Sequence, residues 1–367
     1  MMLNPWMKRG LILAMAASFS TSYAQSADQK RLAENVNPAA PKAFAYTPDG
    51  NISPRNDLFN DVSDVQTFLP IPDQADARPK PMNQGTYNLQ RVGENSYVVT
   101  AGTNQNAFVV TSKGVVVIDA PPALETQLPA AIRKVTNLPV THVIITHDHY
   151  DHIGAAKKLF PQATFVAHQL TADHLKNFPD PERPQPTVTF SGERYVLTVG
   201  GVPIELIYPG QNHDTGNILV YVPSSKLAVM TDLVMPGWIP YRNWGNADSI
   251  PGILKAHDAI LKLDFTTYVG GHVYRTGTRY DVQQSREYWN DMWAWTNEAI
   301  ASTPEVRVSD PDNAWAANKA WQDAVADKVT ARLIAKWKDR LAGTDTFTHA
   351  TVVATIISIF TDNPKLP

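Results

Sequence analysis

Short runs of β-branched and aromatic residues alternate with Gly/Asn turns through residues 86–121, and this pattern predicts consecutive antiparallel strands. Residues 114–120 (GVVVIDA) are apolar on both faces, which predicts a buried central strand that ends at Asp119. A helix is predicted at 124–137, and a second buried strand is predicted at 139–146. This alternation of strands and helices indicates an α/β fold.

The alternation continues as a second block after residue 146. A helix is predicted to begin within 154–160, and further strands are predicted at 163–168, 194–209, 217–223, 226–232 and 266–271. Several of these segments end at a His or Asp residue. Because functional side chains gather on the loops at one edge of such sheets, the pattern predicts a site built from strand ends.

The chain becomes helical and rich in tryptophan after residue 280. An apolar residue recurs every four positions along one helical stripe, which comprises Trp321, Val325, Val329, Leu333, Trp337 and Leu341. We expect residues 302–367 to form a helical C-terminal extension that packs onto an α/β domain at 86–301. The alternative use of the stripe is as the face of a homodimer.

Composition narrows the chemistry that the chain can perform. The sequence has 367 residues, of which 43% are hydrophobic, which is enough for a sizeable core. The formal net charge is −3 and no basic surface is apparent, so we expect no nucleic-acid partner. The chain has no cysteine, which excludes disulfides, thiolate metal ligands and a Cys nucleophile. Any metal ion must therefore be bound by His, Asp or Glu.

The N-terminus has the pattern of a secretory signal peptide at residues 1–24. Lys8 and Arg9 precede an apolar run at 11–19, and the small residues before Ala24 suit cleavage. The alternative, a membrane anchor, is disfavoured because a spanning helix needs about 20 apolar residues. We therefore expect a periplasmic or secreted protein without a stable membrane span, followed by an irregular N-terminal extension at 25–85.

Three histidines and two aspartates fall within the six residues 147–152, HDHYDH. In an extended segment, His147 and His149 point to the same side and can converge on one ion. Asp151 and His152 fall where the chain turns into the next helix and can face a second ion. Imidazole and carboxylate groups at these spacings suit zinc, manganese or iron. A polar loop that contains these residues by chance is the less favoured interpretation.

A metal site at this edge requires further ligands at the ends of later strands. His213 lies before the predicted strand 217–223, Asp232 ends the strand 226–232, and His272 follows the strand 266–271. Asp232 by itself could equally be a capping or turn residue. Together with the HDHYDH segment, these positions bring the candidate ligands to seven.

In these residues the sequence resembles the metallo-β-lactamase-fold superfamily of metal-dependent hydrolases, over about residues 86–301. Five motifs occur in order, namely Asp119, the H-x-H-x-D-H core (His147, His149, Asp151, His152), His213, Asp232 and the Gly-Gly-His at His272. The resemblance implies a four-layer αββα sandwich with a two-metal cleft along one edge. It also implies a hydrolase of a small-molecule substrate, and the signal-peptide pattern at 1–24 adds the expectation of export.

The resemblance further implies the role of each residue. His147, His149 and His213 would bind one divalent ion, Asp151, His152 and His272 would bind the other, and Asp232 would bridge the two. Asp119 would orient a ligand imidazole. The ions, zinc first with manganese or iron as alternatives, would activate a water molecule between them. Asp232 would act catalytically through the ion pair, and Asp151 could also take part in proton transfer.

The substrate class stays open among an ester, a lactone and a related acyl or phosphoryl compound. A β-lactamase is the first alternative. The absence of cysteine excludes the β-lactamases with a Cys metal ligand, and the group that relies on His and Asp alone typically lacks an acidic bridging residue, whereas this chain has Asp232. The second alternative is an iron-dependent persulfide dioxygenase of the same fold. The signal-lactone hydrolases usually carry a Tyr three residues after the bridging Asp, where this chain has Met235. A metal chaperone and a nuclease are less favoured.

The loop after Asp232 is the predicted specificity element. Trp238, Tyr241 and Trp244 could form an aromatic wall for an apolar or ring-containing substrate. The alternative is that these side chains pack against the C-terminal helices. The sequence favours neither interpretation.

Overall fold

The computed structural model describes residues 45–46, 52–53, 67–82 and 86–362. The predicted signal peptide at 1–24, and most of the predicted extension at 25–85, lie outside these residues. Two short strands, β1 (Ala45–Tyr46) and β2 (Ile52–Ser53), pair in antiparallel fashion and belong to a separate unit of the chain at 1–67. The remaining elements belong to the unit Phe68–Pro367.

The first sheet of this unit has seven strands in sequence order. They are β3 (Asn88–Arg91), β4 (Ser96–Ala101), β5 (Asn104–Thr111), β6 (Gly114–Ile118), β7 (Val140–Ile144), β8 (Thr164–His168) and β9 (Val188–Phe190). Pairing is antiparallel from β3 to β6 and parallel from β6 to β9. Every residue of β6 is buried, as the sequence predicted for 114–118.

The second sheet has five strands, also in sequence order. They are β10 (Arg194–Val199), β11 (Val202–Ile207), β12 (Leu219–Val222), β13 (Leu227–Val229) and β14 (Thr267–Val269). Only β13 and β14 pair in parallel. The helix α8 (Ile250–Leu261) lies between these two strands in the sequence, because a parallel pair needs a crossover.

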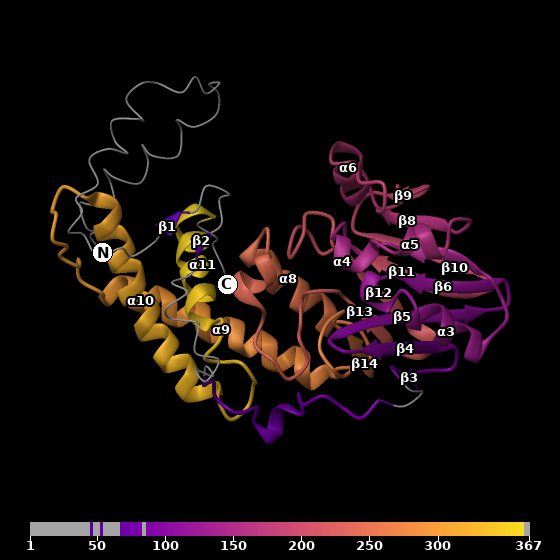
Figure 1. Cartoon of the computed structure of the whole chain (residues 1–367), viewed down its shortest axis with the longest axis horizontal. Coiled ribbons are helices and arrows are strands. Elements are labelled where there is room, and N and C mark those ends of the chain that lie inside the picture. Colours follow the sequence, from indigo (N-terminus) through magenta and orange to yellow (C-terminus); the bar gives the residue numbers. More distant parts are fainter. Residues whose placement is uncertain (1–44, 47–51, 54–66, 83–85, 363–367) are drawn as a thin grey trace. The chain divides into compact units, whose positions relative to one another are not determined.

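The two sheets stack face to face, with helices on both outer faces (Figure 1). Alternate residues of β6 face opposite ways: Val116 and Ile118 meet Val220 and Val229 of the other sheet, whereas Val117 faces the outer helices. The outer helices of the first sheet are α3 (Gln127–Val135), α4 (Tyr150–Ile153), α5 (Ala156–Leu159) and α6 (Gln169–Asn177). The predicted four-layer αββα sandwich is confirmed.

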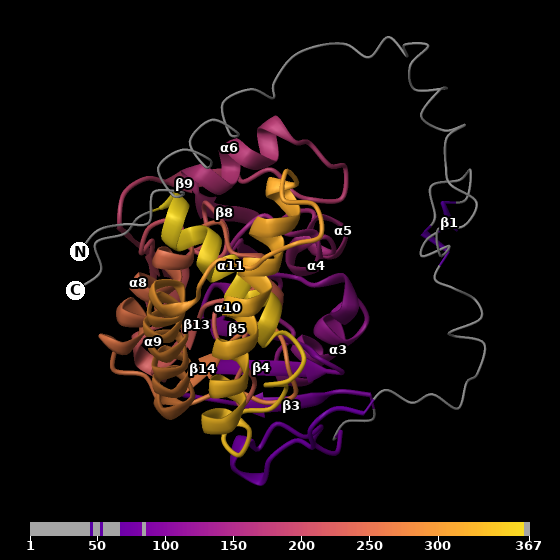
Figure 2. The ribbon, with the colours of Figure 1, turned by 90° about the vertical axis from the view of Figure 1, so that its left-hand side faces the viewer.

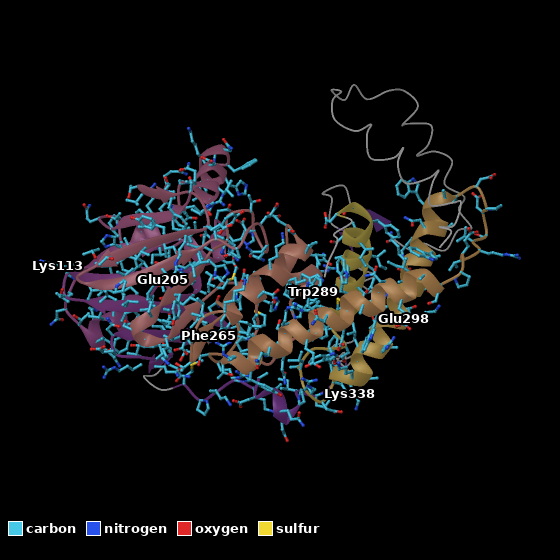
Figure 3. All side chains as sticks on the ribbon, turned by 180° about the vertical axis from the view of Figure 1, so that it is seen from behind. Lys113, Glu205, Phe265, Trp289, Glu298 and Lys338 are labelled. Carbon is cyan, nitrogen blue, oxygen red and sulfur yellow. The ribbon has the colours of Figure 1, made fainter. Side chains whose placement is uncertain are left out.

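In the second outer layer α8 covers the sheet, and three C-terminal helices, α9 (Arg279–Ser302), α10 (Ala314–Trp337) and α11 (Thr348–Thr361), continue the layer beyond the strands (Figure 1). These three helices lie side by side (Figure 2). Trp289 of α9, labelled in Figure 3, is buried in their shared core with Trp337.

The apolar stripe of α10 packs inside the molecule. Val325, Val329, Leu333 and Trp337 are buried in the core that joins the helices to the second sheet. This position confirms packing as the use of the stripe, because these side chains are already covered within one chain. None of the described helices is long and apolar enough to cross a membrane.

Within this unit, the segment 68–82 of the N-terminal extension contains one short 3-10 helix, Asp73–Ala75. It is attached to the rest of the unit by Arg275, whose guanidinium donates to the carbonyls of Ala75 and Asp76 at 2.8 and 2.9 Å and to Asp281 at 2.7 Å. With these bonds, the guanidinium of Arg275 links the segment to the start of α9.

His257 is a buried titratable group between α8 and α9. Its Nδ1 lies 2.7 Å from the carbonyl oxygen of Ile253, and the hydroxyl of Ser285 lies 2.9 Å from its Nε2. These partners suit a neutral ring, which donates from Nδ1 and accepts at Nε2. Burial lowers the pKa of His257 from its ordinary 6.5 to about 4.

We predict that His257→Gln flattens the dependence of stability on pH. In the wild type the unfolded chain takes up a proton below about pH 6.5, whereas the folded chain does so only near pH 4, so the free energy of unfolding falls across this window by on the order of 3 kcal/mol. The measurement is urea denaturation at several pH values. The half-exposed His349→Gln serves as control, and equal slopes in the wild type and His257→Gln would contradict the prediction.

Candidate metal centre

The ends of five strands bring the seven predicted ligands together along one edge of the sandwich. His147 and His149 follow β7, Asp151 and His152 lie in α4, His213 lies between β11 and β12, and Asp232 and His272 follow β13 and β14. The two sheets also meet here, because the backbone N–H of Gln105 in β5 donates to the carbonyl of Gly271 at 2.7 Å. The site therefore depends on the stacking of both sheets.

One group consists of His147, His149, His213 and Asp232, each with a ligand-type atom within 4.8 Å of the others. His213 Nε2 lies 3.0 Å from His149 Nδ1 and 3.2 Å from Asp232 Oδ2. His147 Nε2 lies 3.8 Å from the same oxygen. All but the partly exposed His149 are buried.

The second group consists of Asp151, His152 and His272. The Nε2 atoms of His152 and His272 lie 3.1 Å apart, and Asp151 Oδ2 is 3.4 and 3.5 Å from them. Asp232 also faces this group, with Oδ2 at 3.1 Å from His152 and Oδ1 at 3.2 Å from His272. The carboxylate of Asp232 therefore lies between the two groups.

The spacing fits metal coordination. Four ligands of one zinc ion, at bond lengths of about 2.0 to 2.2 Å, lie roughly 3.3 to 3.6 Å from one another in tetrahedral geometry. The separations of 3.0 to 3.8 Å around Asp232 Oδ2 fall near this range. His147 Nε2 is buried and has no hydrogen-bond partner among the described residues, so a cation would complete its bonding. The residues present therefore fit the divalent ions that the sequence predicted.

The electrostatics of the groups point the same way. Burial lowers the pKa of His147 well below its ordinary value and also lowers the pKa of His149, which leaves both imidazoles neutral, as metal ligation requires. Burial opposes protonation of His152, but the Asp232 carboxylate overrides it and raises the pKa of His152 to about 9. The negative charge of Asp232, which stabilises a proton on His152, would also stabilise a metal ion bound there.

Asp119 supports the centre through two threonines. Its Oδ1 accepts from the backbone N–H of Thr146 at 2.8 Å, and its Oδ2 accepts from the hydroxyls of Thr146 and Thr231 at 2.7 and 3.1 Å. Thr146 Oγ1 in turn lies 3.0 Å from His147 Nδ1. Asp119 is thus linked to the imidazole of His147 through Thr146. It is also linked to the backbone beside Asp232 through Thr231, the residue that precedes Asp232.

Further residues that the sequence analysis missed hold the ligand loops. The side-chain oxygen of Asn212 accepts from the backbone N–H of His213 at 2.8 Å, and the amide of Asn217 donates to the carbonyl of Thr231 at 3.0 Å. Tyr268, fully buried in β14, donates to the carbonyl of Met230 at 2.7 Å. A polar side chain inside an otherwise apolar strand was the available signal for Tyr268.

The backbone at the site is strained at three non-glycine residues. Asp119, Asp232 and Val273 have φ angles of 62°, 65° and 71°, in the left-handed region. For a β-branched residue such as Val273 this conformation is a true outlier, and such residues persist only where their surroundings hold them. The strain is therefore concentrated beside the ligands.

The three residues of the predicted aromatic wall differ in their burial. Trp244 is only 3% exposed and packs against Tyr288 and Trp289, which corrects its assignment to the substrate wall. Trp238 is partly buried against Ile71 and Ala342, which also favours packing. Tyr241 is 50% exposed and remains available for a substrate. The sequence could not separate these roles because an aromatic side chain suits both.

The two variable residues of the H-x-H-x-D-H core contact a proline-rich insertion at 178–186. The hydroxyl of Tyr150 donates to Glu182 at 3.0 Å. Arg183 donates to the carbonyl of Asp148 at 3.0 Å, and His174 of α6 contacts the Asp148 carboxylate. The insertion therefore braces the loop that carries His147 and His149.

Comparisons with known proteins agree with this geometry. Residues 100–287 match the model of the family described as the metallo-beta-lactamase superfamily. The chain is 30% identical over 218 residues to the 2,4-dinitroanisole O-demethylase subunit alpha of a Nocardioides species, which covers 57% of this chain and 64% of that protein. It is 31% identical over 157 residues to a type 2 metallo-beta-lactamase of Bacillus cereus, 39% of this chain and 59% of that protein.

Among solved structures, a metallo-beta-lactamase from Pontibacter korlensis aligns with a TM-score of 0.48 and 22% identity, over 56% of this chain and 99% of that one. The chain thus spans less than two thirds of the length of the two curated relatives. The helices α10 and α11 lie outside the residues that match the family model.

We predict that Thr146→Val weakens metal binding by about 10-fold or more, because the change removes the hydroxyl that links Asp119 to His147. The measurement is competition with a chromophoric chelator. Thr141→Val, within the preceding strand β7, controls for the loss of a threonine hydroxyl. An affinity of Thr146→Val equal to that of the wild type would refute the orienting role of Asp119.

Proposed function

The chain belongs to the metallo-beta-lactamase superfamily, and from this premise we propose that it is a dinuclear metal-dependent hydrolase of a small, apolar or ring-containing substrate. The observation that carries the proposal is the position of Asp232. Its Oδ2 lies 3.2 and 3.8 Å from the Nε2 atoms of His213 and His147 in one group and 3.1 Å from that of His152 in the other. Its Oδ1 lies 3.2 Å from Nε2 of His272, also in the second group. Such a shared carboxylate is suited to holding two cations close together.

In the proposed enzyme, His147, His149 and His213 hold one divalent ion, and Asp151, His152 and His272 hold the other, with Asp232 shared. When bound, such an ion pair lowers the pKa of a water molecule so that it can attack at neutral pH, and it polarises the bond to be cleaved. No Ser or Cys nucleophile is then needed. Zinc suits these neutral imidazoles and carboxylates, and manganese or iron are the alternatives.

The ligand side chains differ in their exposure to solvent, and this difference indicates where a substrate can approach. The side chains of Asp151 and His272 are 60% and 27% exposed, whereas those of His147, His152 and His213 are at most 3% exposed. A substrate can therefore approach on the side of Asp151. The Asp151 carboxylate, held by His272, can accept a proton there and return it to the leaving group.

Asp232→Asn tests the shared carboxylate. Because the change removes the charge from both ligand groups while keeping the shape of the side chain, we expect kcat/KM to fall at least about 100-fold. Hydrolysis of chromogenic esters, lactones, phosphotriesters and β-lactams by protein loaded separately with zinc, manganese and iron identifies the substrate for this measurement. Asp264→Asn, at a side chain that is 78% exposed, is the control. Equal activity of Asp232→Asn and Asp264→Asn would refute the proposal.

A second candidate function is the cleavage of an activated aryl ether. It is supported by the 30% identity to the 2,4-dinitroanisole O-demethylase subunit alpha over 57% of this chain. With water as co-reactant, a methyl aryl ether yields a phenol and methanol, so the same activated water suffices. Dinitroanisole therefore belongs in the substrate panel. Release of a nitrophenol without ester or lactone hydrolysis would favour this candidate.

Two other activities remain as alternatives within the proposal. The likeness to the Bacillus cereus protein supports amide hydrolysis of a β-lactam. An iron-dependent persulfide dioxygenase is the oxidative alternative, which would require oxygen consumption by iron-loaded protein. We also propose export to the periplasm or beyond on the basis of residues 1–24, and N-terminal sequencing of the mature protein tests this.

Tyr241 is the proposed aromatic contact for the substrate. Its ring packs edge-on against Phe347 at 4.8 Å, yet half of the residue is exposed. We predict that Tyr241→Ala raises KM several-fold, since a modest loss of apolar contact is worth about 1 to 2 kcal/mol, with kcat little changed. Tyr280→Ala, at an equally exposed tyrosine, is the control. An unchanged KM would remove Tyr241 from the substrate site.

A further inference from the structure

The short helix α7 (Arg242–Asn246) is a left-handed turn next to the metal centre. Asn243, Trp244, Gly245 and Asn246 have φ angles of 53°, 58°, 73° and 56°. This conformation costs Trp244 roughly 1 to 2 kcal/mol and the two asparagines less, because asparagine adopts it more readily. Such a run persists only where its surroundings hold it in place.

On one side, α7 is held by two threonines of α11. Thr351 Oγ1 accepts from the backbone N–H of Asn243 at 3.2 Å, and Thr355 Oγ1 accepts from the indole N–H of Trp244 at 3.0 Å. Both threonines and Trp244 are buried. Because an unpaired N–H in such a core is costly, the hydroxyl of Thr355 fixes where the Trp244 side chain can lie.

On the other side, α7 lies directly against the metal centre. A Cβ atom at Gly245 would lie 3.2 Å from the carbonyl oxygen of Asp232 and 3.4 Å from His213 Nδ1. The chain then runs along the loop of His213, where the backbone N–H of Asp248 donates to the carbonyl of His213 at 3.1 Å and that of Ser249 donates to Asn212 at 2.9 Å. The turn is therefore a wall behind the imidazole of His213.

We propose that α11 is a positioning element of the metal centre, acting from Thr355 through the left-handed turn to His213. This inference rests on the proposed function only in taking His213 as a metal ligand. The inference assigns a role to α11, which lies outside residues 100–287, the part of the chain that matches the family model. Thr355 is thus a positioning residue that does not touch the metal site itself.

The test measures metal affinity in the folded protein, by chelator competition well below the melting temperature. Thr355→Val keeps the shape of the side chain and removes the hydrogen-bond acceptor of the Trp244 indole. We expect this change to lower the affinity for one of the two ions about three- to tenfold, which is less than the effect expected from changing a residue in direct contact with a ligand. Thr355→Ser keeps the hydroxyl and should retain wild-type affinity. A role confined to stability would lower the melting temperature without changing the affinity.

Thr296→Val is the matched control, because Thr296 is also a fully buried threonine and its hydroxyl has no hydrogen-bond partner among the described residues. Its metal affinity should equal that of the wild type.

Gly245→Ala tests the same inference on the side of the turn that faces the metal centre. The added methyl group crowds Asp232 and His213, and we expect roughly tenfold or greater loss of affinity for the same ion. Gly192→Ala is its control, since Gly192 has a similar φ of 85° but open space around it. Any effect of the positive φ alone is shared by both variants.

Two results would overturn the inference. If the wild type binds two ions and both Thr355→Val and Gly245→Ala bind them as tightly as their controls, α11 has no positioning role and the proposed function stands. If the wild type binds no metal, this inference and the proposed function both fail.

Discussion

The carboxylate of Asp232 is the group on which the site depends, because it is buried and shared. A buried charge is costly unless it is paired, and the nitrogen atoms of four histidines surround this one at 3.1 to 3.8 Å. His147 contributes a buried nitrogen without a hydrogen-bond partner among the described residues. Two cations would satisfy the carboxylate and the crowded imidazoles together, whereas protons could satisfy only some of them.

The fold supplies this arrangement through its two sheets and through α11. Each sheet has parallel strands that end at this edge, among them β6 with β7 and β13 with β14. Six of the seven ligands follow β7, β13 or β14, and His213 lies between β11 and β12. The left-handed backbone at Asp119 and Asp232 turns the chain sharply at the edge. Buried polar side chains, among them Thr146 and Thr231, hold these turns. The helices behind the second sheet then press the α7 turn against His213.

The sequence predicted the parts of the site that have a local pattern. The HDHYDH segment, the buried strands and the later His and Asp at strand ends were enough to name the seven residues that the structure brings together. Thr146 and Asn212 could not be found in this way, because a threonine or asparagine beside a ligand is common in any polar loop. Their roles depend on contacts between strands far apart in the sequence.

The aromatic loop shows a second limit of sequence patterns. Tyr241 and Trp244 are three residues apart, yet one is half exposed and the other is buried against α9 and α11. Apolar character alone does not distinguish a substrate wall from a core. The left-handed turn that contains Trp244 has only Asn243, Gly245 and Asn246 as a sequence signal. The stripe of α10 was more predictable, since its helical period leaves one face to bury.

A crystal structure of the metal-loaded protein, with anomalous scattering data collected at the absorption edge of the bound metal, tests the central claim most directly. Two peaks are expected on either side of the Asp232 carboxylate, one contacting His147, His149 and His213 and the other contacting Asp151, His152 and His272. A single peak, or metal bound only at the separate group Asp148, His174 and Asp214, would contradict the account.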